Sequence, residues 1–278
     1  MPERIDLYDS HYSHDEADVY RAIRRETFGE DLRQASWITA PECDELCSWL
    51  GLFPSSAVLE VACGSGGVAL RIAERFRCSV VGVDINEAAI SAATRRSAER
   101  GGTGRTRFRV GDGDEPLPFD DDSFDAVFCN DAINHLKDRE RVLADWHRLL
   151  KVGGRCLYTD PVVVTGCLTK EEIAARSSIG FFLFTPVGAN EALLDSAGFS
   201  LLRTEDVMDS VVTIAGRWLE ARSSRRDALV ELEGELGYDD VQRFLQTVHA
   251  LASERRLSRF AYLAERSSAG FTGATRQS

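Results

Sequence analysis

One stretch decides how the rest of this sequence is interpreted: Val58-Leu59-Glu60-Val61-Ala62-Cys63-Gly64-Ser65-Gly66-Gly67-Val68-Ala69-Leu70. Its apolar start, residues 58–62, is typical of a buried parallel strand, and its end has the apolar spacing of a helix. Gly64 and Gly66 can adopt backbone conformations denied to other residues and let a ligand approach the main chain, while the first amides of the helix supply donors. Because Ala62 stands where a G-x-G-x-x-G turn has its first glycine, the pattern favours a nucleoside without phosphates over a dinucleotide.

Polar residues close each of the next three apolar strands. The residues that follow the strands at 79–83, 106–110 and 124–129 are, in order, Asp84, Asp112 and Asn130-Asp131. The carboxyl ends of parallel strands meet at one edge of a sheet, so these side chains should converge on the glycine turn. Asp84 is an acid at a strand end, where it could accept hydrogen bonds from both hydroxyls of a ribose.

Strands and helices alternate along most of the chain. The predicted strands are 58–62, 79–83, 106–110, 124–129, 155–159, 201–207 and 257–264, and the predicted helices between them include 67–76, 86–100, 139–150, 170–178, 189–197 and 208–254. This alternation predicts a doubly wound, mostly parallel, seven-stranded α/β sheet of the Rossmann-like type, with an antiparallel final strand.

The segments outside this alternation predict how the chain is divided. We expect an N-terminal lid and helices over residues 1–50, a ligand-binding core over 51–165, a helical and apolar lid inserted after the fifth strand over 166–198, the C-terminal part of the sheet with helices over 199–266, and a disordered tail over 267–278.

Composition excludes several classes of function. The net charge of −12 and the pI near 5.0 disfavour binding to nucleic acid or to an anionic membrane, although a local basic patch could override that average. No apolar run has the length of a signal-peptide core or a membrane span. Seven cysteines are an odd number, and Cys43 and Cys47 have no neighbouring ligands to complete a metal site, so we expect reduced core thiols in a cytoplasmic protein.

The ordered set of glycine turn, ribose acid and later polar strand ends resembles the S-adenosylmethionine-dependent methyltransferases with a Rossmann-like fold. The resemblance covers residues 55–165. It implies that S-adenosylmethionine binds at the turn and that a methyl group is transferred by direct displacement. Such a displacement requires alignment of donor and acceptor and exclusion of water, and it requires no metal.

A closer resemblance, to the phosphoethanolamine and sarcosine/dimethylglycine methyltransferases, rests on these features: the D-x-x-x-H pattern of Asp131 and His135, Thr159-Asp160-Pro161 after the fifth strand, and Tyr12 and Tyr20 ahead of Phe28-Gly29-Glu30. It implies that Tyr12 pairs with His135 over the substrate. Asp131 and His135 lie at helical spacing. Held either by Asp131 or by the backbone, His135 would act as a base or as a latch that closes the site.

The same resemblance assigns residues to the donor. It places Glu60 near the methionine end, Asp84 and Ile85 at the ribose, Asp112 and Gly113 at the adenine, and Gln34 in contact with the donor, beside the turn residues Ala62, Gly64 and Gly66 and the strand-end residue Asn130.

The apolar run at residues 179–184 contains three phenylalanines and is predicted to line an acceptor pocket. The candidate acceptor contacts are Tyr20, Ile179, Phe181 and Phe184. Pro161 and residues 177–182 stand where the related enzymes have tyrosines and basic phosphate ligands. This departure argues against phosphoethanolamine itself as the acceptor.

The sequence therefore predicts a methyltransferase that acts on nitrogen or oxygen of a small molecule, as a monomer or homodimer without nucleic-acid or membrane partners. One alternative is methylation of carbon in a terpenoid or other lipophilic metabolite, which the phenylalanines favour. Another is a non-catalytic, nucleoside-binding regulatory module, against which Tyr12, Asp131 and His135 argue.

Overall fold

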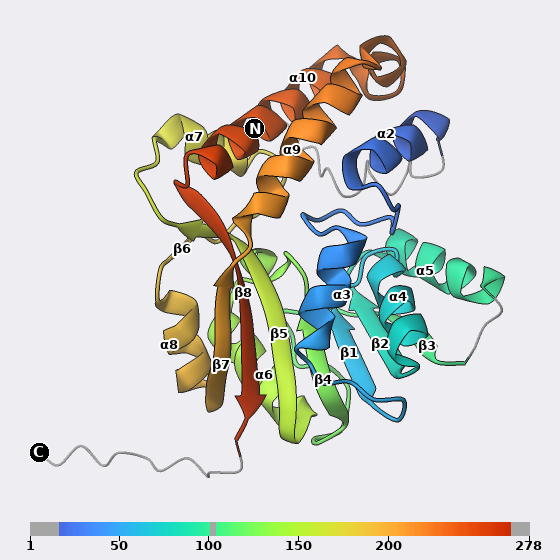
Figure 1. Ribbon diagram of the computed structural model, residues 1–278, viewed down its shortest axis with the longest axis vertical. Helices are drawn as coiled ribbons and strands as arrows, with labels where there is room; N and C mark the ends of the chain where they lie inside the picture. The colour runs from blue at the N-terminus through green and yellow to red at the C-terminus, as the bar shows by residue number, and fades with distance from the viewer. Residues whose placement is uncertain (1–16, 101–103, 268–278) are drawn as a thin grey trace, which may run out of the picture.

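A mixed sheet lies at the centre of the structure, a computed structural model that describes residues 17–100 and 104–267 (Figure 1). Its strands are β1 (Ala57–Val61), β2 (Ser79–Asp84), β3 (Thr106–Val110), β4 (Phe124–Cys129), β5 (Leu150–Val164), β6 (Thr185–Pro186), β7 (Phe199–Asp206) and β8 (Leu257–Arg266). Seven of them run in the order β3-β2-β1-β4-β5-β8-β7, and β6 pairs with the end of β5. Strand β8 lies antiparallel between β5 and β7, whereas the remaining pairs are parallel. The predicted Rossmann-like sheet is confirmed, with β6 as an additional strand too short to produce a periodic pattern.

Helices cover both faces of the sheet because neighbouring residues of each central strand point to opposite sides. The helices are α2 (Asp18–Phe28), α3 (Ala40–Ser48), α4 (Gly67–Phe76), α5 (Glu87–Glu99), α6 (Arg139–Leu149), α7 (Lys170–Arg176), α8 (Ala189–Ser196), α9 (Met208–Ser223) and α10 (Arg226–Ser253), with a single 3-10 turn η1 (Ile133–His135). In β1, Val58 packs in the cluster that contains α3 and α4, and Leu59 packs in the cluster that contains α6 and α8. Burial on both faces explains the continuous apolar run of β1.

A helical cap made of α2, α7, α9 and α10 lies beyond one end of the sheet (Figure 1). Its aromatic centre is formed around Trp37. The ring centroid of Trp37 lies 6.0 Å from that of Trp218 and 6.4 Å from that of Phe244. Helix α10 bends at Gly234, which has a φ of 74° inside the helix. None of the helices within residues 17–100 and 104–267 is both long and apolar enough to cross a membrane.

Strand β5 differs from its predicted bounds. It runs from Leu150 to Val164, so Asp160 and Pro161 lie inside the strand instead of after it. The pairing of β5 with β8 shifts register between Asp160 and Val163, and a proline without an amide hydrogen is accommodated at such an irregularity. The side chain of Asp160 is consequently buried in the sheet and does not reach its open end.

All seven cysteines are free thiols, and Cys43 and Cys47 are buried between α3 and the sheet. Within the described residues no group of three His, Cys, Asp or Glu side chains could hold a metal ion.

Candidate active site

The glycine turn joins β1 to α4 with a tight backbone path. Gly64 and Gly66 have φ values of 53° and 78°, a region that favours glycine. A Cβ atom on Gly66 would lie 2.7 Å from the Cβ of Ala93, and one on Gly67 would lie 1.6 Å from the carbonyl oxygen of Leu32. Gly66 therefore packs against α5 and does not line the cavity, which corrects its expected contact with the ligand.

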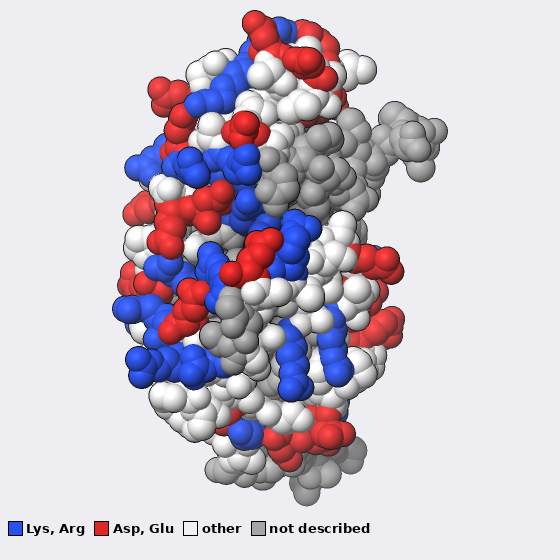
Figure 2. Space-filling view, turned by 90° about the vertical axis from the view of Figure 1, so that its right-hand side faces the viewer, with Lys and Arg blue, Asp and Glu red and all other residues white. Residues whose placement is uncertain are grey.

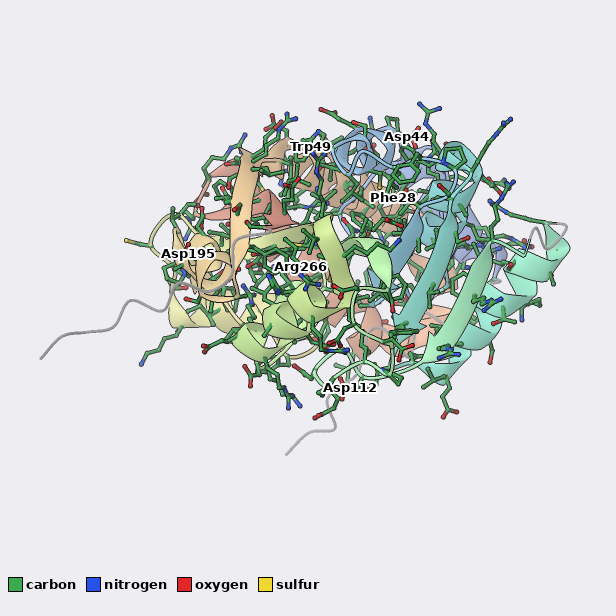
Figure 3. The ribbon with its side chains drawn as sticks, turned by 90° about the horizontal axis from the view of Figure 1, so that it is seen from below. Phe28, Asp44, Trp49, Asp112, Asp195 and Arg266 are labelled. Atoms are coloured by element: carbon green, nitrogen blue, oxygen red, sulfur yellow. The ribbon has the colours of Figure 1, made fainter. Side chains whose placement is uncertain are left out.

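A cavity of about 480 Å³ opens at the carboxyl ends of β1, β2, β3 and β4. It brings together most residues that the sequence assigned to the donor and catalytic sites: Gln34, Glu60, Ala62, Gly64, Asp84, Ile85, Asp112, Gly113, Asn130, Asp131 and His135. Phe181 of the predicted acceptor segment lines the same cavity. Figure 3 shows Asp112 near the periphery of the molecule, on the opposite side of the sheet from Asp44 and Trp49.

Asp84 is held by the backbone at the end of β2. The amides of Gly64 and Asn86 donate to its two carboxylate oxygens at 2.7 and 2.9 Å. Burial raises the pKa of this carboxyl above its ordinary value, and the two amide hydrogen bonds offset part of that effect. Each oxygen keeps a second lone pair, so the carboxylate can still accept from the two hydroxyls of a ribose.

Two buried oxygen atoms at the other end of the cavity have no hydrogen-bond partner within the described part of the chain. They are Glu60 Oε2 and Gln34 Oε1, and Gln34 is held in place because its Nε2 donates to the carbonyl of Ile38 at 3.0 Å. Buried acceptors without a donor are costly, which indicates that a ligand supplies the donor. A carboxylate and an amide oxygen suit a cationic amino group, such as the α-ammonium of a methionine moiety.

We expect Glu60 to make the ligand-free protein less stable as the pH rises. Burial raises its pKa well above the ordinary 4.5, and a hydrogen bond from the Ala69 amide does not offset that. Above pH 4.5 the folded chain therefore binds more protons than the unfolded chain, and the unfolding free energy falls with increasing pH. In thermal melts from pH 4 to 8, the melting temperature of Glu60→Gln should rise relative to that of the wild type as the pH increases. The exposed control Glu45→Gln should show no such trend, and parallel curves for Glu60→Gln would contradict the argument.

Asp131 is used in a buried network instead of supporting His135. Thr159 Oγ1 and Arg259 Nε each donate to Asp131 Oδ1 at 2.6 Å, and the Trp37 amide donates to Oδ2 at 2.8 Å. Asp131 has a φ of 53°, and only the 3-10 turn η1 follows it, so Asp131 and His135 do not take the helical spacing that the D-x-x-x-H pattern suggested. A left-handed residue interrupts the helical spacing that the sequence suggested. A catalytic role for Asp131 stays a prediction.

His135 is held by the acceptor segment. Its Nδ1 lies 2.7 Å from the carbonyl oxygen of Phe181, and its Nε2 lies 3.2 Å from Asn134 Nδ2. The ring also contacts Phe182 edge to face, with centroids 4.6 Å apart. The sequence left open whether Asp131 or the backbone holds His135, and the structure shows a backbone carbonyl in that position. Tyr12, the expected partner of His135, lies outside the described residues.

A second cavity, of about 30 Å³, adjoins the first beneath the helical cap. The two share Ala35, Ser36, Asp131 and His135, and the smaller one is further lined by Trp37, Asn134, Pro161, Arg176, Ile179, Phe182, Trp218 and Phe244. Ile179 therefore lies where an acceptor contact was expected. Phe184 lines neither cavity and packs against the core of the cap, which corrects its assignment.

Tyr20 is also away from both cavities. It is buried in α2, and its hydroxyl donates to Glu233 of α10, so it ties α2 to the cap. Its hydroxyl is engaged with Glu233 and Tyr20 lines neither cavity, so the structure does not place Tyr20 at the expected acceptor contact.

Arg176 was not found from the sequence. Its guanidinium lies over Phe182 and Phe244, 4.5 and 5.2 Å from the ring centroids, so a basic group borders the smaller cavity from just before residues 177–182. Arg176 closes an ordinary short helix, and its aromatic neighbours come from separate segments, so no local pattern marked it. Arg259 and Asn134 were missed for the same reason.

Comparison with known proteins agrees with this geometry. Residues 59–158 match the family model described as a methyltransferase domain. Sarcosine/dimethylglycine N-methyltransferase of Halorhodospira halochloris is 30% identical over 222 residues, which cover 77% of this chain and 75% of that protein. The chain therefore belongs to the S-adenosylmethionine-dependent methyltransferases.

Further relatives place the chain within that family. Phosphoethanolamine N-methyltransferase 1 of Zea mays is 29% identical over 197 residues, or 71% of this chain, but the chain spans only 38% of that protein's length. Among solved structures, a putative sarcosine dimethylglycine methyltransferase from Galdieria sulphuraria has the same fold, with a TM-score of 0.78 at 19% identity, covering 92% of this chain and 99% of that one.

Proposed function

We propose that this chain transfers a methyl group from S-adenosylmethionine to nitrogen or oxygen of a small molecule. The observation that carries the proposal is that the two cavities adjoin and share Asp131 and His135, where the reacting groups would meet. The smaller cavity has a volume of only about 30 Å³, which favours a small acceptor over an extended lipid. The relatives named for N-methylation of sarcosine and phosphoethanolamine support the same assignment.

The donor would lie along the larger cavity. Gln34 and Glu60 would receive its ammonium, Asp84 and Ile85 would hold the ribose, and Asp112 with Gly113 would hold the adenine. Their shared cavity and the two oxygens without donors support this orientation. The residues align the donor and exclude water, which is the main requirement of a displacement at a sulfonium methyl group.

His135 would act as the latch of the acceptor site. Its contact with the Phe181 carbonyl ties η1 to the loop before β6, and the Leu183 amide donates to the Asn134 carbonyl at 2.8 Å alongside it. Both bonds hold one wall of the acceptor region against the sheet. Tyr12 would complete the closure from the N-terminal segment.

The surroundings of the site support the remaining assignments. Of the two expected lid ranges, 1–50 and 166–198, the cap helices α2 and α7 would serve as lids, whereas α3 and α8 pack against the sheet. The net charge of −12, and the mixture of both signs on the face in Figure 2, argue against nucleic acid as a partner. We propose a cytoplasmic monomer or homodimer.

The two phenylalanines of the acceptor segment should respond differently to alanine. Phe181 is 42% exposed and lines the larger cavity, whereas Phe184 packs in the cap. Phe181→Ala should raise the KM for the acceptor several-fold and leave the melting temperature almost unchanged. Phe184→Ala should lower the unfolding free energy by about 1 to 3 kcal/mol. Steady-state kinetics and thermal melts on both variants test this, and equal loss of stability in both would contradict it.

The decisive experiment is to incubate the purified protein with methyl-labelled S-adenosylmethionine and cell extract and to identify the labelled product. A label on nitrogen or oxygen of a small molecule is expected. A label on carbon of a lipophilic metabolite would favour the terpenoid alternative. Binding of the donor without any labelled product would favour a regulatory module.

A further inference from the structure

Asn134 is a fully buried polar residue of the smaller cavity, next in sequence to His135, which lines both cavities. It lies on η1 and lines the smaller cavity. Its Oδ1 is buried and has no hydrogen-bond partner among residues 17–100 and 104–267. The chain thus keeps one more unused acceptor oxygen, and this one lies beside the predicted transfer point instead of at the donor end.

The orientation of the Asn134 amide follows from the histidine beside it. A carbonyl oxygen can only accept, so the Nδ1 of His135 carries the hydrogen that bonds Phe181. When the ring carries its one hydrogen on Nδ1, Nε2 offers a lone pair to Asn134 Nδ2, which lies 3.2 Å away. With Nδ2 directed at the ring, Oδ1 is the amide atom left for a bound acceptor.

We propose that Asn134 is a specificity-determining residue whose Oδ1 accepts a hydrogen bond from an N–H of the acceptor, so that the enzyme favours primary and secondary amines over tertiary amines. This inference rests on the proposed function and specifies its acceptor. A buried oxygen without a donor binds more tightly to a ligand that supplies an N–H. A ligand without an N–H leaves the oxygen unpaired and binds more weakly.

Methyl transfer strengthens the hydrogen bond between the acceptor N–H and Asn134 Oδ1 during the reaction. The lone pair of the neutral amine forms the new N–C bond while the C–S bond breaks and its electron pair stays on sulfur. Positive charge moves from sulfur to nitrogen, so the remaining N–H becomes a better donor to Oδ1 in the transition state. The product ammonium later releases a proton to water. A neutral tertiary amine has no N–H and receives no such stabilisation.

The test uses two amine series as probes: glycine, sarcosine and dimethylglycine, and phosphoethanolamine with its monomethyl and dimethyl derivatives. We expect wild-type kcat/KM to be about tenfold higher for the primary or secondary amine than for the tertiary amine. Asn134→Leu, similar in volume and without the oxygen, should lower kcat/KM about tenfold for amines with an N–H and bring the two classes within about twofold of each other. Asn134→Ala should likewise lower the ratio of kcat/KM for amines with an N–H to kcat/KM for the tertiary amine.

Ile133→Val is the matched control, because it alters the packing of the same turn and no polar atom. It should change all three amines of a series equally, and donor affinity measured by calorimetry should be unchanged in every variant. Thermal melts confirm folding. Should both Asn134 variants fail to fold, the wild-type ranking still decides, since a preference for the tertiary amine would overturn the inference.

The inference is also overturned if Asn134→Leu lowers all three amines equally, or if no amine accepts a methyl group from a protein that binds the donor. In the latter case a labelled hydroxyl or carbon product from cell extract would leave the proposed function standing. Absence of donor binding would remove the proposed function itself.

Discussion

Replacing Arg259 with methionine should lower the free energy of unfolding by about 3 to 5 kcal/mol. The guanidinium is fully buried on β8, and it donates to Asp131 and Glu42 at 2.6 Å each and to Asn130 Oδ1 at 2.9 Å. Without it, two largely buried carboxylates lose their counter-charge. The cost of an unpaired buried charge exceeds the net value of the ion pair, so the loss should be large.

Urea denaturation of both proteins measures this change. Arg243→Met is the matched control, because Arg243 pairs with Asp240 on the exposed surface and should lose several-fold less stability. The double variant Arg259→Met/Asp131→Asn should recover part of the loss, since it removes one of the stranded charges. If Arg259→Met is as stable as the control, the ion pairs of Arg259 with Asp131 and Glu42 do not stabilise the fold as expected.

The second large effect is expected for the donor. Asp84→Ala should weaken the binding of S-adenosylmethionine and of its demethylated product by about 1.5 to 3 kcal/mol, or roughly ten- to a hundredfold. The substitution removes the carboxylate proposed to accept hydrogen bonds from two ribose hydroxyls. It also removes the partner of the Gly64 and Asn86 amides, which orders the turn.

Isothermal titration calorimetry with both ligands tests this expectation. Asp84→Asn keeps one oxygen in place and should lose less affinity than Asp84→Ala, while the exposed control Asp120→Ala should bind like the wild type. Unaltered affinity in Asp84→Ala would show that the ribose is held elsewhere. Absence of binding by the wild-type protein would contradict the donor site as a whole.

The sequence by itself determined the architecture and the convergence of the residues proposed for the donor site. The apolar run before the glycine turn, the apolar strand before Asp84 and the strand before Asn130 depend on local periodicity, which backbone geometry imposes within a few residues. Acids at the carboxyl ends of parallel strands converge because topology leaves them no other place. Glu60, Asp84, Ile85 and Asp112 accordingly lie around one cavity, as expected.

Only the tertiary structure decided how the acceptor half is built. Asp131 and Arg259 are 128 residues apart in the chain, and the pair redirects Asp131 from His135 into the core. His135 finds its support 46 residues away, at a backbone carbonyl that no side-chain pattern can indicate. Tyr20 is buried and Phe184 is partly buried by helices of the cap, whereas Arg176 and Asn134 border the smaller cavity. These contacts join segments that are distant in sequence, and their energies depend on burial and hydrogen-bond geometry that exist only after the chain has folded.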